Sequence, residues 1–366
     1  MRAHRGPLRP PRPDPMQITE IPVPGYEKVV RGVDPATGLR AFIAVHDTTL
    51  GPALGGMRLL PYQSEDEALF DVKRLARGMT YKSACAETGL GGGKSVLMGD
   101  PASKSPQLFQ AMGRFVESLG GLYITAEDMN IGIPDLREVR KTTQHVSGLS
   151  REEGGSGNPS PYTARGVVVG MRAVLEEAFG SDSFEGRSIL IQGVGAVGAP
   201  MASMLKERGA QVVVCDILEE RSKKLAAEHG YRYVPHDGHH RQAVDVYAPC
   251  ARGAGVNDDT LPELRCKAIA GCANNILLEE RHGAELARRG IVYAPDYVIN
   301  AGGIINVGAE VRPEGYDEAY ALERIDRIYD TLKEVFRIAR EQRLPTQAAA
   351  DRLAELRLAA ARKAKA

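Results

Sequence analysis

Residues 188–216 read SILIQGVGAVGAPMASMLKERGAQVVVCD, and this stretch predicts the fold of the second half of the chain. Residues 187–192 are rich in aliphatic and β-branched side chains, which indicates a strand. The Gly-x-Gly-x-x-Gly sequence of Gly193–Gly198 follows and opens a helix that runs through Leu205. A second strand ends at Asp216. A strand, a glycine turn, a helix and a second strand with a terminal acidic residue predict a dinucleotide-binding fold.

The same stretch predicts the cofactor. Glycines let a pyrophosphate approach the N-terminus of the helix, where free N–H groups and the helix dipole favour an anion. The carboxylate of Asp216 can accept hydrogen bonds from the adenosine ribose, and its charge would repel a 2′-phosphate. We therefore expect NAD rather than NADP, bound by Gly193, Val194, Gly195, Ala196, Val197, Gly198 and Asp216.

Strands and helices continue to alternate after this motif. Further buried strands are predicted over residues 244–248, 267–270 and 291–293. In α/β proteins the residues that follow such strands form the binding crevice. Asn274, Asn275 and Asn300 occupy these positions, and their amides could hold a ligand. For Asn274 and Asn275, turn formation is an equally good explanation. One long helix is predicted over Tyr316–Gln342 because its apolar residues recur at helical spacing.

The first half of the chain contains a second glycine-rich stretch, Gly89–Pro101, with Lys94 directly after three glycines. A phosphate loop is excluded because the spacing is one residue short and a strand, not a helix, follows. What remains is a lysine at the start of a short apolar strand. Desolvation and a second cation, for which Lys82 is the candidate, would lower the pKa of this amine. A neutral lysine can act as a general base, although a solvated surface turn is the simpler explanation of the local sequence alone.

The elements around Lys94 predict an α/β domain. Two strands at Tyr26–Arg31 and Leu39–His46 precede a loop punctuated by glycine and proline over residues 46–58. Ser64 and Glu67 form a capping box that starts a helix. After a strand at residues 122–125, Asp128 either carries chemistry or caps the next helix, and local sequence does not separate the two.

A loop of turn residues over 154–161 marks the hinge between two domains. We predict a disordered tail over residues 1–15 and a catalytic and oligomerisation domain over residues 16–150, to which about 345–366 return. Residues 151–344 form the Rossmann-type domain that binds NAD. Met16 is an alternative start, because the Arg- and Pro-rich segment before it is neither a secretory signal nor a transit peptide.

Composition excludes several other classes of protein. The 366 residues carry a formal net charge of zero and 43% hydrophobic residues, which is ordinary for a soluble globular protein and argues against bulk nucleic-acid or membrane binding. Five cysteines without a Cys-x-x-Cys pattern indicate free thiols in a reducing compartment, so we expect a cytoplasmic protein. No spacing of His, Cys and acidic residues predicts a metal site.

Several motifs together resemble one known family, the amino-acid dehydrogenases that act on glutamate, leucine, phenylalanine or valine. The motifs that carry this resemblance are Gly55-Gly56-x-Arg58, Gly78–Lys82, Gly91–Lys94, Thr125–Asp128, Gly157–Pro159, Gly193–Gly198 and Tyr293–Gly303. The leucine branch of the family looks most similar, and the valine branch comes next. The resemblance implies reversible, NAD-dependent oxidative deamination of an L-amino acid to a 2-oxo acid and ammonia, by a homo-oligomer of unspecified size.

The resemblance also implies roles for single residues. Lys94 would be the general base and Asp128 would shuttle a proton. Lys82 would bind the substrate carboxylate, and Asn275 and Asn300 would contact substrate or cofactor. Residues implied beside the substrate are Leu54, Gly55, Gly56, Met79, Ala126, Ile304 and Val307. Ser160 and Thr163 are implied near the nicotinamide, and the other residues implied to bind the cofactor are Cys250, Ala251 and Asn274.

The residues of the pocket favour a branched aliphatic amino acid. Glutamate enzymes of the family carry a lysine where this chain has Leu54, and an unpaired buried carboxylate is expensive. Ala126, Ile304 and Val307 should narrow the pocket against an aromatic ring. Arg58-Leu59-Leu60 departs from the leucine pattern at the pocket rim. The alternatives are a phenylalanine dehydrogenase and a non-catalytic NAD-binding regulator, although a regulator would not need Lys82, Lys94 and Asp128.

Overall fold

The structure is a computed structural model that describes residues 16–251 and 253–365. Its internal contacts divide the chain into two compact units. Unit 1 comprises residues 1–47, 53–76 and 93–146, and unit 2 comprises residues 48–52, 77–92 and 147–366. Helix α1 and strand β5 each have residues in both units. The predicted residue 1–15 tail lies outside the described residues.

Unit 1 contains a six-stranded sheet in the order β1-β2-β3-β5-β4-β6. Its strands are β1 (Gln17–Glu20), β2 (Lys28–Asp34), β3 (Leu39–Asp47), β4 (Ala53–Leu60), β5 (Gly91–Met98) and β6 (Tyr123–Ala126). Strands β1, β2 and β3 pair antiparallel, whereas β4 and β6 pair parallel. The region 46–58 was predicted to be a loop, and that prediction is wrong from Ala53 onward. Its glycines and proline hid a strand that lies inside the sheet between β5 and β6.

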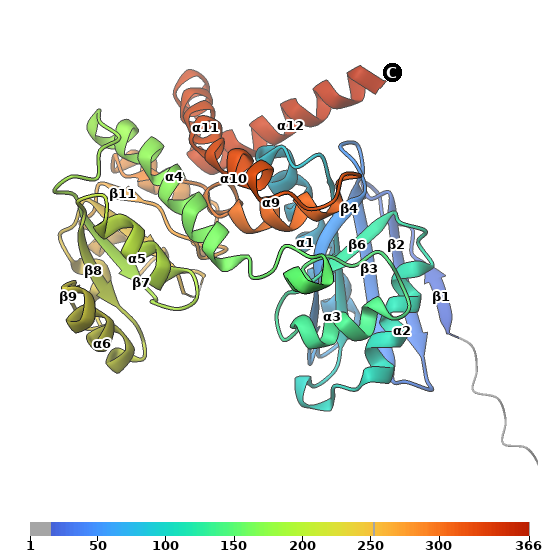
Figure 1. Ribbon diagram of the computed structural model, residues 1–366. Helices are drawn as coiled ribbons and strands as arrows, with labels where there is room; N and C mark the ends of the chain where they lie inside the picture. The colour runs from blue at the N-terminus through green and yellow to red at the C-terminus, as the bar shows by residue number, and fades with distance from the viewer. Residues whose placement is uncertain (1–15, 252, 366) are drawn as a thin grey trace, which may run out of the picture. The chain divides into compact units, whose positions relative to one another are not determined.

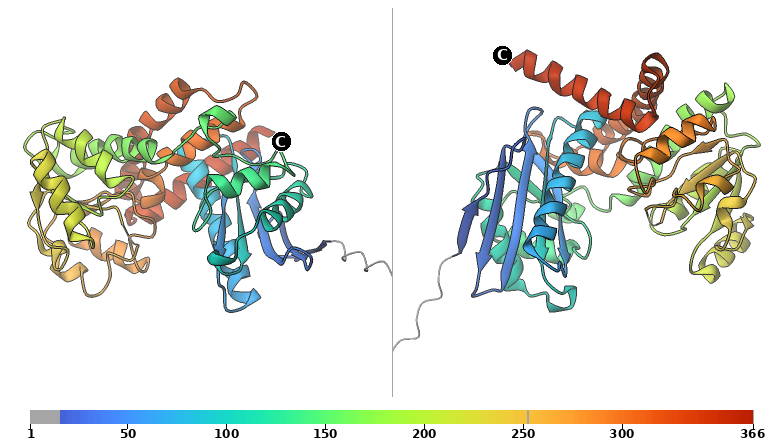
Figure 2. Two further views of the ribbon diagram at one scale, coloured as in Figure 1. Left: turned by 60° about the horizontal axis from the view of Figure 1, so that its bottom comes forward. Right: turned by 180° about the vertical axis from the view of Figure 1, so that it is seen from behind.

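Helices cover both faces of this sheet (Figures 1 and 2). The helices are α1 (Glu65–Ala86), α2 (Pro106–Glu117) and α3 (Ile133–Arg140). On one face, Val29 and Phe42 pack in a cluster with Val72 of α1. On the opposite face, Gly32 lies against the ring of Phe115 of α2, where an added Cβ would come within 2.8 Å of the ring. Both faces of the sheet are therefore buried.

The glycines before Lys94 have a packing function. A Cβ on Gly92 would lie 2.1 Å from the backbone nitrogen of Thr80 in α1, so α1 and β5 touch backbone to backbone. A Cβ on Gly93 would lie 2.7 Å from the ring of Tyr123 and 3.1 Å from the Cβ of Ala53. Only glycine permits this closeness, and the close packing brings Lys94 into the interior of the sheet.

Unit 2 contains a second six-stranded sheet, in the order β12-β11-β10-β7-β8-β9. Every pair of neighbouring strands is parallel. Its strands are β7 (Ser188–Gln192), β8 (Gln211–Cys215), β9 (Arg232–Tyr233), β10 (Val246–Pro249), β11 (Ala268–Ile269) and β12 (Val292–Tyr293). Its complete helices are α4 (Ser160–Phe179), α5 (Gly198–Lys206), α6 (Glu219–His229), α7 (Arg281–Arg288), α8 (Asp296–Ile299), α9 (Gly302–Gly308), α10 (Glu318–Asp326), α11 (Ile328–Gln342) and α12 (Thr346–Lys365).

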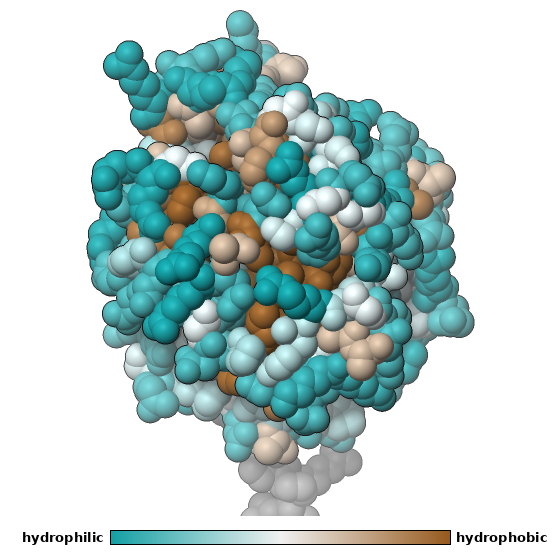
Figure 3. All heavy atoms as spheres, turned by 90° about the vertical axis from the view of Figure 1, so that its left-hand side faces the viewer, coloured by the Kyte–Doolittle hydropathy of each residue, from teal (hydrophilic) through white to brown (hydrophobic). Residues whose placement is uncertain are grey.

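Alternate residues of these strands enter two different hydrophobic clusters. Ile189 and Ile191 of β7 pack with α4 and α5, whereas Leu190 between them packs in a cluster with Leu286 of α7. A parallel sheet buried on both faces is the doubly wound arrangement, and the prediction of a two-domain α/β fold with a Rossmann-type domain is confirmed. Figure 3 presents the face that lies on the side of β8, β9 and α6 in Figure 1, where hydrophilic residues predominate around a central group of apolar ones.

The C-terminal part of the chain differs from its prediction in one detail. The single helix expected over Tyr316–Gln342 is two helices, α10 and α11, which separate at Arg327. Helix α12 returns to α1, since Arg357 Nη1 donates to the carbonyl of Cys85, 2.6 Å away. The contacts group this end of α1 with α12, in unit 2. None of the helices described is long and apolar enough to cross a membrane.

Glycine packing generates a stability prediction with a matched control. Gly113 lies in α2, where an added Cβ would be 2.1 Å from Thr142 Oγ1 and 2.5 Å from the carbonyl oxygen of Val139. Gly78 lies in α1 with nothing within 4 Å of its added Cβ. We expect Gly113→Ala to destabilise the protein by about 1–3 kcal/mol through overpacking. Gly78→Ala should stabilise it by about 0.5–1 kcal/mol through helix propensity.

Thermal unfolding followed by circular dichroism measures both effects. An unfolding midpoint for Gly113→Ala at or above that of the parent protein would contradict the close packing of α2 on the 139–142 turn.

Candidate active site

Unit 1 contains a buried ion pair between a residue within β5 and a residue that follows the end of β6. Lys94 lies on β5 and is 4% exposed, and its Nζ contacts Asp128 Oδ2. Asp128 follows β6 and also accepts a hydrogen bond from the backbone N–H of Met129 (2.6 Å). Helix α3 begins at Ile133 with Gly132 as its N-cap, so capping of that helix does not explain Asp128. The acid–base interpretation of Asp128 remains.

Arg58 joins this pair to a second carboxylate. Its Nε donates to Asp128 Oδ1 (3.1 Å) and its Nη1 donates to Asp71 Oδ2 (3.3 Å). Tyr62 donates its hydroxyl to the same oxygen of Asp71 (2.8 Å), and the pKa of Tyr62 is raised by burial and by this carboxylate. Two cations therefore alternate with two carboxylates in a largely buried row. Sequence analysis quoted Arg58 as part of a motif but assigned it no role.

The surroundings of Lys94 lower the pKa of its amine. Burial lowers the pKa of Lys94 below its ordinary value, and the charge of Arg58 lowers it further, while Asp128 opposes both. Burial alone would raise the pKa of Asp128, but Lys94 and Arg58 outweigh that effect and leave it lowered. The lowering was expected on sequence grounds, with Lys82 as the second cation. Within unit 1 the cation that contributes is Arg58.

Glycines of β4 bring this strand against Asp128. Gly55 and Gly56 lie opposite Thr125 and Ala126 in the parallel pairing of β4 with β6. A Cβ on Gly56 would lie 2.4 Å from the carbonyl oxygen of Glu127 and 2.8 Å from the Cβ of Asp128. Leu54 is 2% exposed and Ala126 is 7% exposed, so both side chains are buried in unit 1. Six predicted site residues therefore belong to three neighbouring strands of this sheet. Leu54, Gly55 and Gly56 lie on β4, and Lys94 lies on β5 on one side of it. Ala126 ends β6 on the other side, and Asp128 follows it.

Unit 2 holds a second polar group around Lys82. Lys82 Nζ donates to Asn300 Oδ1 (2.6 Å). Asn300 is 4% exposed, and its Nδ2 donates to Asn274 Oδ1 (2.8 Å) and to the carbonyl of Cys272 (3.1 Å). Asn275, next along the chain, adopts a left-handed backbone with φ of 53°. Lys82, Asn274 and Asn300 are therefore linked directly, and they join α1 to the ends of β11 and α8.

The remaining predicted pocket residues of unit 2 lie on helices. Met79 is half-buried on α1, and Ile304 and Val307 lie on α9, with Val307 9% exposed. Ser160 begins α4, and Thr163 follows one turn later. A Cβ on Gly303 would lie 2.7 Å from Thr163 Oγ1, so the starts of α4 and α9 are in close contact.

The glycine loop after β7 is held by Asp216. Gly193 has φ of 100°, and its N–H donates to the carbonyl of Cys215 (2.8 Å). Val194 N–H donates to Asp216 Oδ2 (2.9 Å), and the N–H of Leu218 donates to Oδ1 (2.9 Å). Asp216 therefore braces the loop as well as lying at the end of β8.

Two observations test whether this loop suits a dinucleotide. A Cβ on Gly198 would lie 2.0 Å from the carbonyl oxygen of Gly193, so this glycine is required for helix packing. Gly195 is not among the glycines with positive φ, and nothing lies within 4 Å of its added Cβ, so no contact with the described residues requires glycine there. An open glycine beside the start of a helix is what the approach of a pyrophosphate needs. Ala251 lies against the same loop, since its Cβ is 2.7 Å from the position of a Cβ on Gly193.

Comparisons with known proteins agree with this geometry. Residues 27–145 match the family described as Glu/Leu/Phe/Val dehydrogenase, dimerisation domain. Residues 154–218 and 214–366 match the Glutamate/Leucine/Phenylalanine/Valine dehydrogenase family. The chain belongs to the Glu/Leu/Phe/Val dehydrogenase family. The resemblance drawn from the motifs is confirmed, and the chain is an amino-acid dehydrogenase by family.

Individual relatives of this dehydrogenase cover most of its length. It is 50% identical to the leucine dehydrogenase of Geobacillus stearothermophilus over 93% of this chain and 92% of that protein. It is 45% identical to the phenylalanine dehydrogenase of Thermoactinomyces intermedius over 91% of this chain and 92% of that protein. Among solved structures, L-tryptophan dehydrogenase from Nostoc punctiforme matches with a TM-score of 0.83 and 41% identity, over 92% of this chain and 97% of that chain.

Within 16–251 and 253–365, no group of three or more His, Cys, Asp or Glu side chains could hold a metal ion.

The row of charges in unit 1 predicts unequal costs for two arginine substitutions. The side chain of Arg58 is 18% exposed between partners that are 16% and 18% exposed, whereas Arg31 pairs with Glu65 at 33% and 37% exposure. Arg58→Gln leaves two largely buried carboxylates short of a partner and should destabilise the protein by about 3 kcal/mol. Arg31→Gln removes a surface pair and should cost about 1 kcal/mol or less. Urea unfolding midpoints compare the two, and equal shifts would contradict the special position of Arg58.

Proposed function

We propose that this chain catalyses the NAD-dependent, reversible oxidative deamination of a branched-chain L-amino acid to its 2-oxo acid, ammonia and NADH. Leucine is the proposed preferred substrate, with valine and isoleucine also accepted. The observation that carries the proposal is the buried Lys94–Asp128 pair, in which the pKa of Lys94 is lowered. An amine that loses its proton near neutral pH is the general base that this reaction needs.

The proposed roles divide between the two units. In unit 2, Lys82 would bind the substrate carboxylate as a cation, and Asn300 would orient Lys82 through their hydrogen bond. In unit 1, neutral Lys94 would take a proton from the water that attacks the imino carbon, and Asp128 would exchange protons with the amino group. Bound NAD would accept the hydride from the substrate Cα. Ser160, Thr163, Cys250, Ala251 and Asn274 would lie beside the nicotinamide half, and Asn275 would contact the substrate.

Preference for an aliphatic side chain is proposed from the lining residues. Leu54 has no charge with which to pair a side-chain carboxylate, and burying an unpaired carboxylate is costly. Ala126, Ile304 and Val307 are apolar, and Met79 would complete the pocket wall. Discrimination among apolar substrates rests on small differences, since one methylene is worth about 1–3 kcal/mol.

Preference for NAD is proposed from the end of β8. Asp216 is 6% exposed, and its carboxylate accepts the N–H of Val194 in the glycine loop and the N–H of Leu218 in the turn that follows β8. It would accept hydrogen bonds from ribose hydroxyls and repel a 2′-phosphate. Ile217 and Leu218, which follow it, are 72% and 56% exposed, and such an apolar surface suits a flat adenine ring.

Assembly and location are proposed as well. A domain whose family is described by dimerisation supports a homo-oligomer, whose size stays open. All five cysteines are free thiols, which suits the reducing cytoplasm. Small molecules, and neither nucleic acid nor membrane, are the proposed partners.

A substrate panel tests the proposal directly. NADH or NADPH formation by the purified protein should occur with leucine, valine and isoleucine in the presence of NAD, and should be weak with phenylalanine, with glutamate, or with NADP. Preference for phenylalanine would keep the mechanism and overturn the proposed pocket. Tight NADH binding with no turnover of any amino acid would favour a non-catalytic regulator.

The base is tested by substitution. Lys94→Met should lower kcat by about 10²–10⁴-fold, the usual contribution of a general base, while leaving NADH affinity unchanged. Lys104→Met is a matched control, because Lys104 pairs with Asp135 in the same unit at a more exposed position. Retained turnover in Lys94→Met would remove Lys94 from its proposed role.

The pH dependence follows from the direction of the pKa shift. Because the neutral amine is the active form, the rate of oxidation should rise with pH through the lowered pKa of Lys94 and level off below the ordinary lysine value. Asp128 raises the pKa of Lys94, so in Asp128→Asn the residual rate should rise at lower pH than in the parent. Profiles of kcat/KM against pH measure this, and a shift to higher pH would contradict the coupling.

A further inference from the structure

Two loops of unit 2 run side by side beyond the ends of β10 and β11. The loop that follows β10 and the loop that follows β11 are joined by three backbone hydrogen bonds: Ala254 N to Asn275 O (2.6 Å), Val256 N to Ile276 O (3.0 Å) and Leu278 N to Val256 O (2.9 Å). We call residues 253–260 and 272–279 together the double loop. It extends the parallel pairing of the sheet by one further bridge, between Val256 and Leu277.

The centre of the double loop is strained and tightly packed. Ala254 and Asn275 both adopt the left-handed conformation, with φ of 59° and 53°, which costs free energy in residues other than glycine. The hydrogen bond between them joins the two strained positions directly. A Cβ on Gly253 would lie 2.5 Å from the carbonyl oxygen of Asn274, so the two backbones are in contact. Such a conformation persists only when surrounding contacts impose it.

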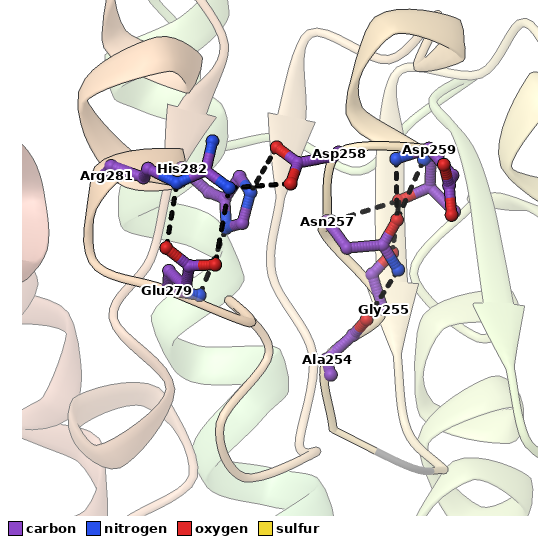
Figure 4. Close-up of polar contacts among 9 residues, drawn as sticks. Ala254, Gly255, Asn257, Asp258, Asp259, Glu279, Arg281 and His282 are labelled. Carbon is purple, nitrogen blue, oxygen red and sulfur yellow. Dashed lines mark hydrogen bonds and ion pairs between the residues drawn. The ribbon is translucent and has the colours of Figure 1, made fainter.

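The outer end of the double loop is held by His282, which is 2% exposed at the start of α7. Its Nδ1 accepts the backbone N–H of Glu279 (3.0 Å), which places the ring proton on Nε2. Nε2 then donates to Asp258 Oδ1 (3.2 Å), and Arg281 donates to the other carboxylate oxygen of Asp258 (2.6 Å). Figure 4 shows His282 and Arg281 reaching Asp258 on one side and Glu279 on the other. One imidazole therefore joins both loops.

The inner end of the double loop reaches the groups proposed for binding. Asn274 accepts the hydrogen bond of Asn300, which in turn accepts that of Lys82. Asp296 Oδ2 accepts the N–H of Ile276 (3.1 Å), so α8 also holds this end. Just before the double loop, Ala251 packs against Gly193 of the glycine loop. Displacement of the double loop would therefore move both the cofactor loop and the Lys82–Asn300 pair.

We infer that His282 is a positioning residue for the reaction: by joining Asp258 and Glu279 it fixes the double loop, and through it the nicotinamide side of the cofactor site and Asn300. The inference rests on the proposed function for the roles of Asn274 and Lys82. His282 touches neither substrate nor cofactor, and it acts through the two loops that it joins.

His282→Leu, which keeps much of the volume but loses both hydrogen bonds, tests the inference. NADH affinity is measured by the fluorescence of NADH itself, which is convenient because the chain contains no Trp. We expect the dissociation constant of NADH to rise about tenfold, the effect of losing roughly one well-placed hydrogen bond, and the KM for leucine to rise with it. His282→Asn can still accept the N–H of Glu279 through its Oδ1, and it should restore most of the NADH affinity.

Two further variants separate positioning from general stability. Asp258→Ala alters a side chain that is 61% exposed, so folding is preserved, and we expect a smaller rise in the NADH dissociation constant of about threefold. His145→Leu removes a histidine–carboxylate pair of unit 1, with Glu117, and should leave NADH affinity unchanged. Thermal midpoints of all variants are recorded alongside.

The inference is overturned if His282→Leu lowers the thermal midpoint while the NADH dissociation constant and the KM for leucine stay at parental values. It is also overturned if His282→Asn binds NADH no better than His282→Leu. Failure of the proposed function would look different: the parent protein would bind NADH without oxidising leucine, and the binding measurements would still decide the role of His282.

Discussion

Burial of one ammonium group is the constraint on which the rest of unit 1 depends. Lys94 is 4% exposed, and an isolated charge at that depth would be prohibitively costly. Two features of the structure bury the Lys94 side chain and compensate its charge. Gly92 and Gly93 let α1 and the neighbouring strands close around β5, which creates the depth. Asp128, held in turn by Arg58 and Met129, provides the compensating charge. The balance leaves the pKa of Lys94 lowered, so the packing that buries the amine is also what suits it to act as a base.

In unit 2, the groups proposed to face the ligands are likewise held by hydrogen bonds within the chain. Asp216 braces the glycine loop through Val194, Asn300 orients Lys82, and the double loop ties both regions to the sheet. In the double loop, Ala254 and Asn275 adopt left-handed conformations. Strain of this kind is commonly stored beside binding sites, where fixed geometry matters more than local stability.

The sequence predicted the parts of the site that carry strong local signals. The glycine loop with Asp216 was recognisable because strand, turn, helix and acid follow one another within thirty residues, roughly one βαβ unit. Lys94 was recognisable from its glycines, and the family from motifs spread along the chain. Strand β4 was missed because Gly55 and Gly56 weaken a strand pattern, and here Gly56 permits the approach of β4 to Asp128. The sequence did not reveal the break between α10 and α11 at Arg327, because the apolar residues keep their helical spacing across it.

By itself the sequence determined the two α/β folding patterns and the glycine loop after β7, because each depends on neighbours in the chain, and it predicted which groups would do acid–base chemistry. Only the tertiary structure decided which charges meet. Within unit 1, Arg58 is a cation that lowers the pKa of Lys94, since β4 and β5 are adjacent in the sheet. Likewise, Asp258 and His282 meet because parallel strands bring successive loops to one edge. Electrostatic interactions fall off with distance in space, and separation along the chain does not reveal that distance.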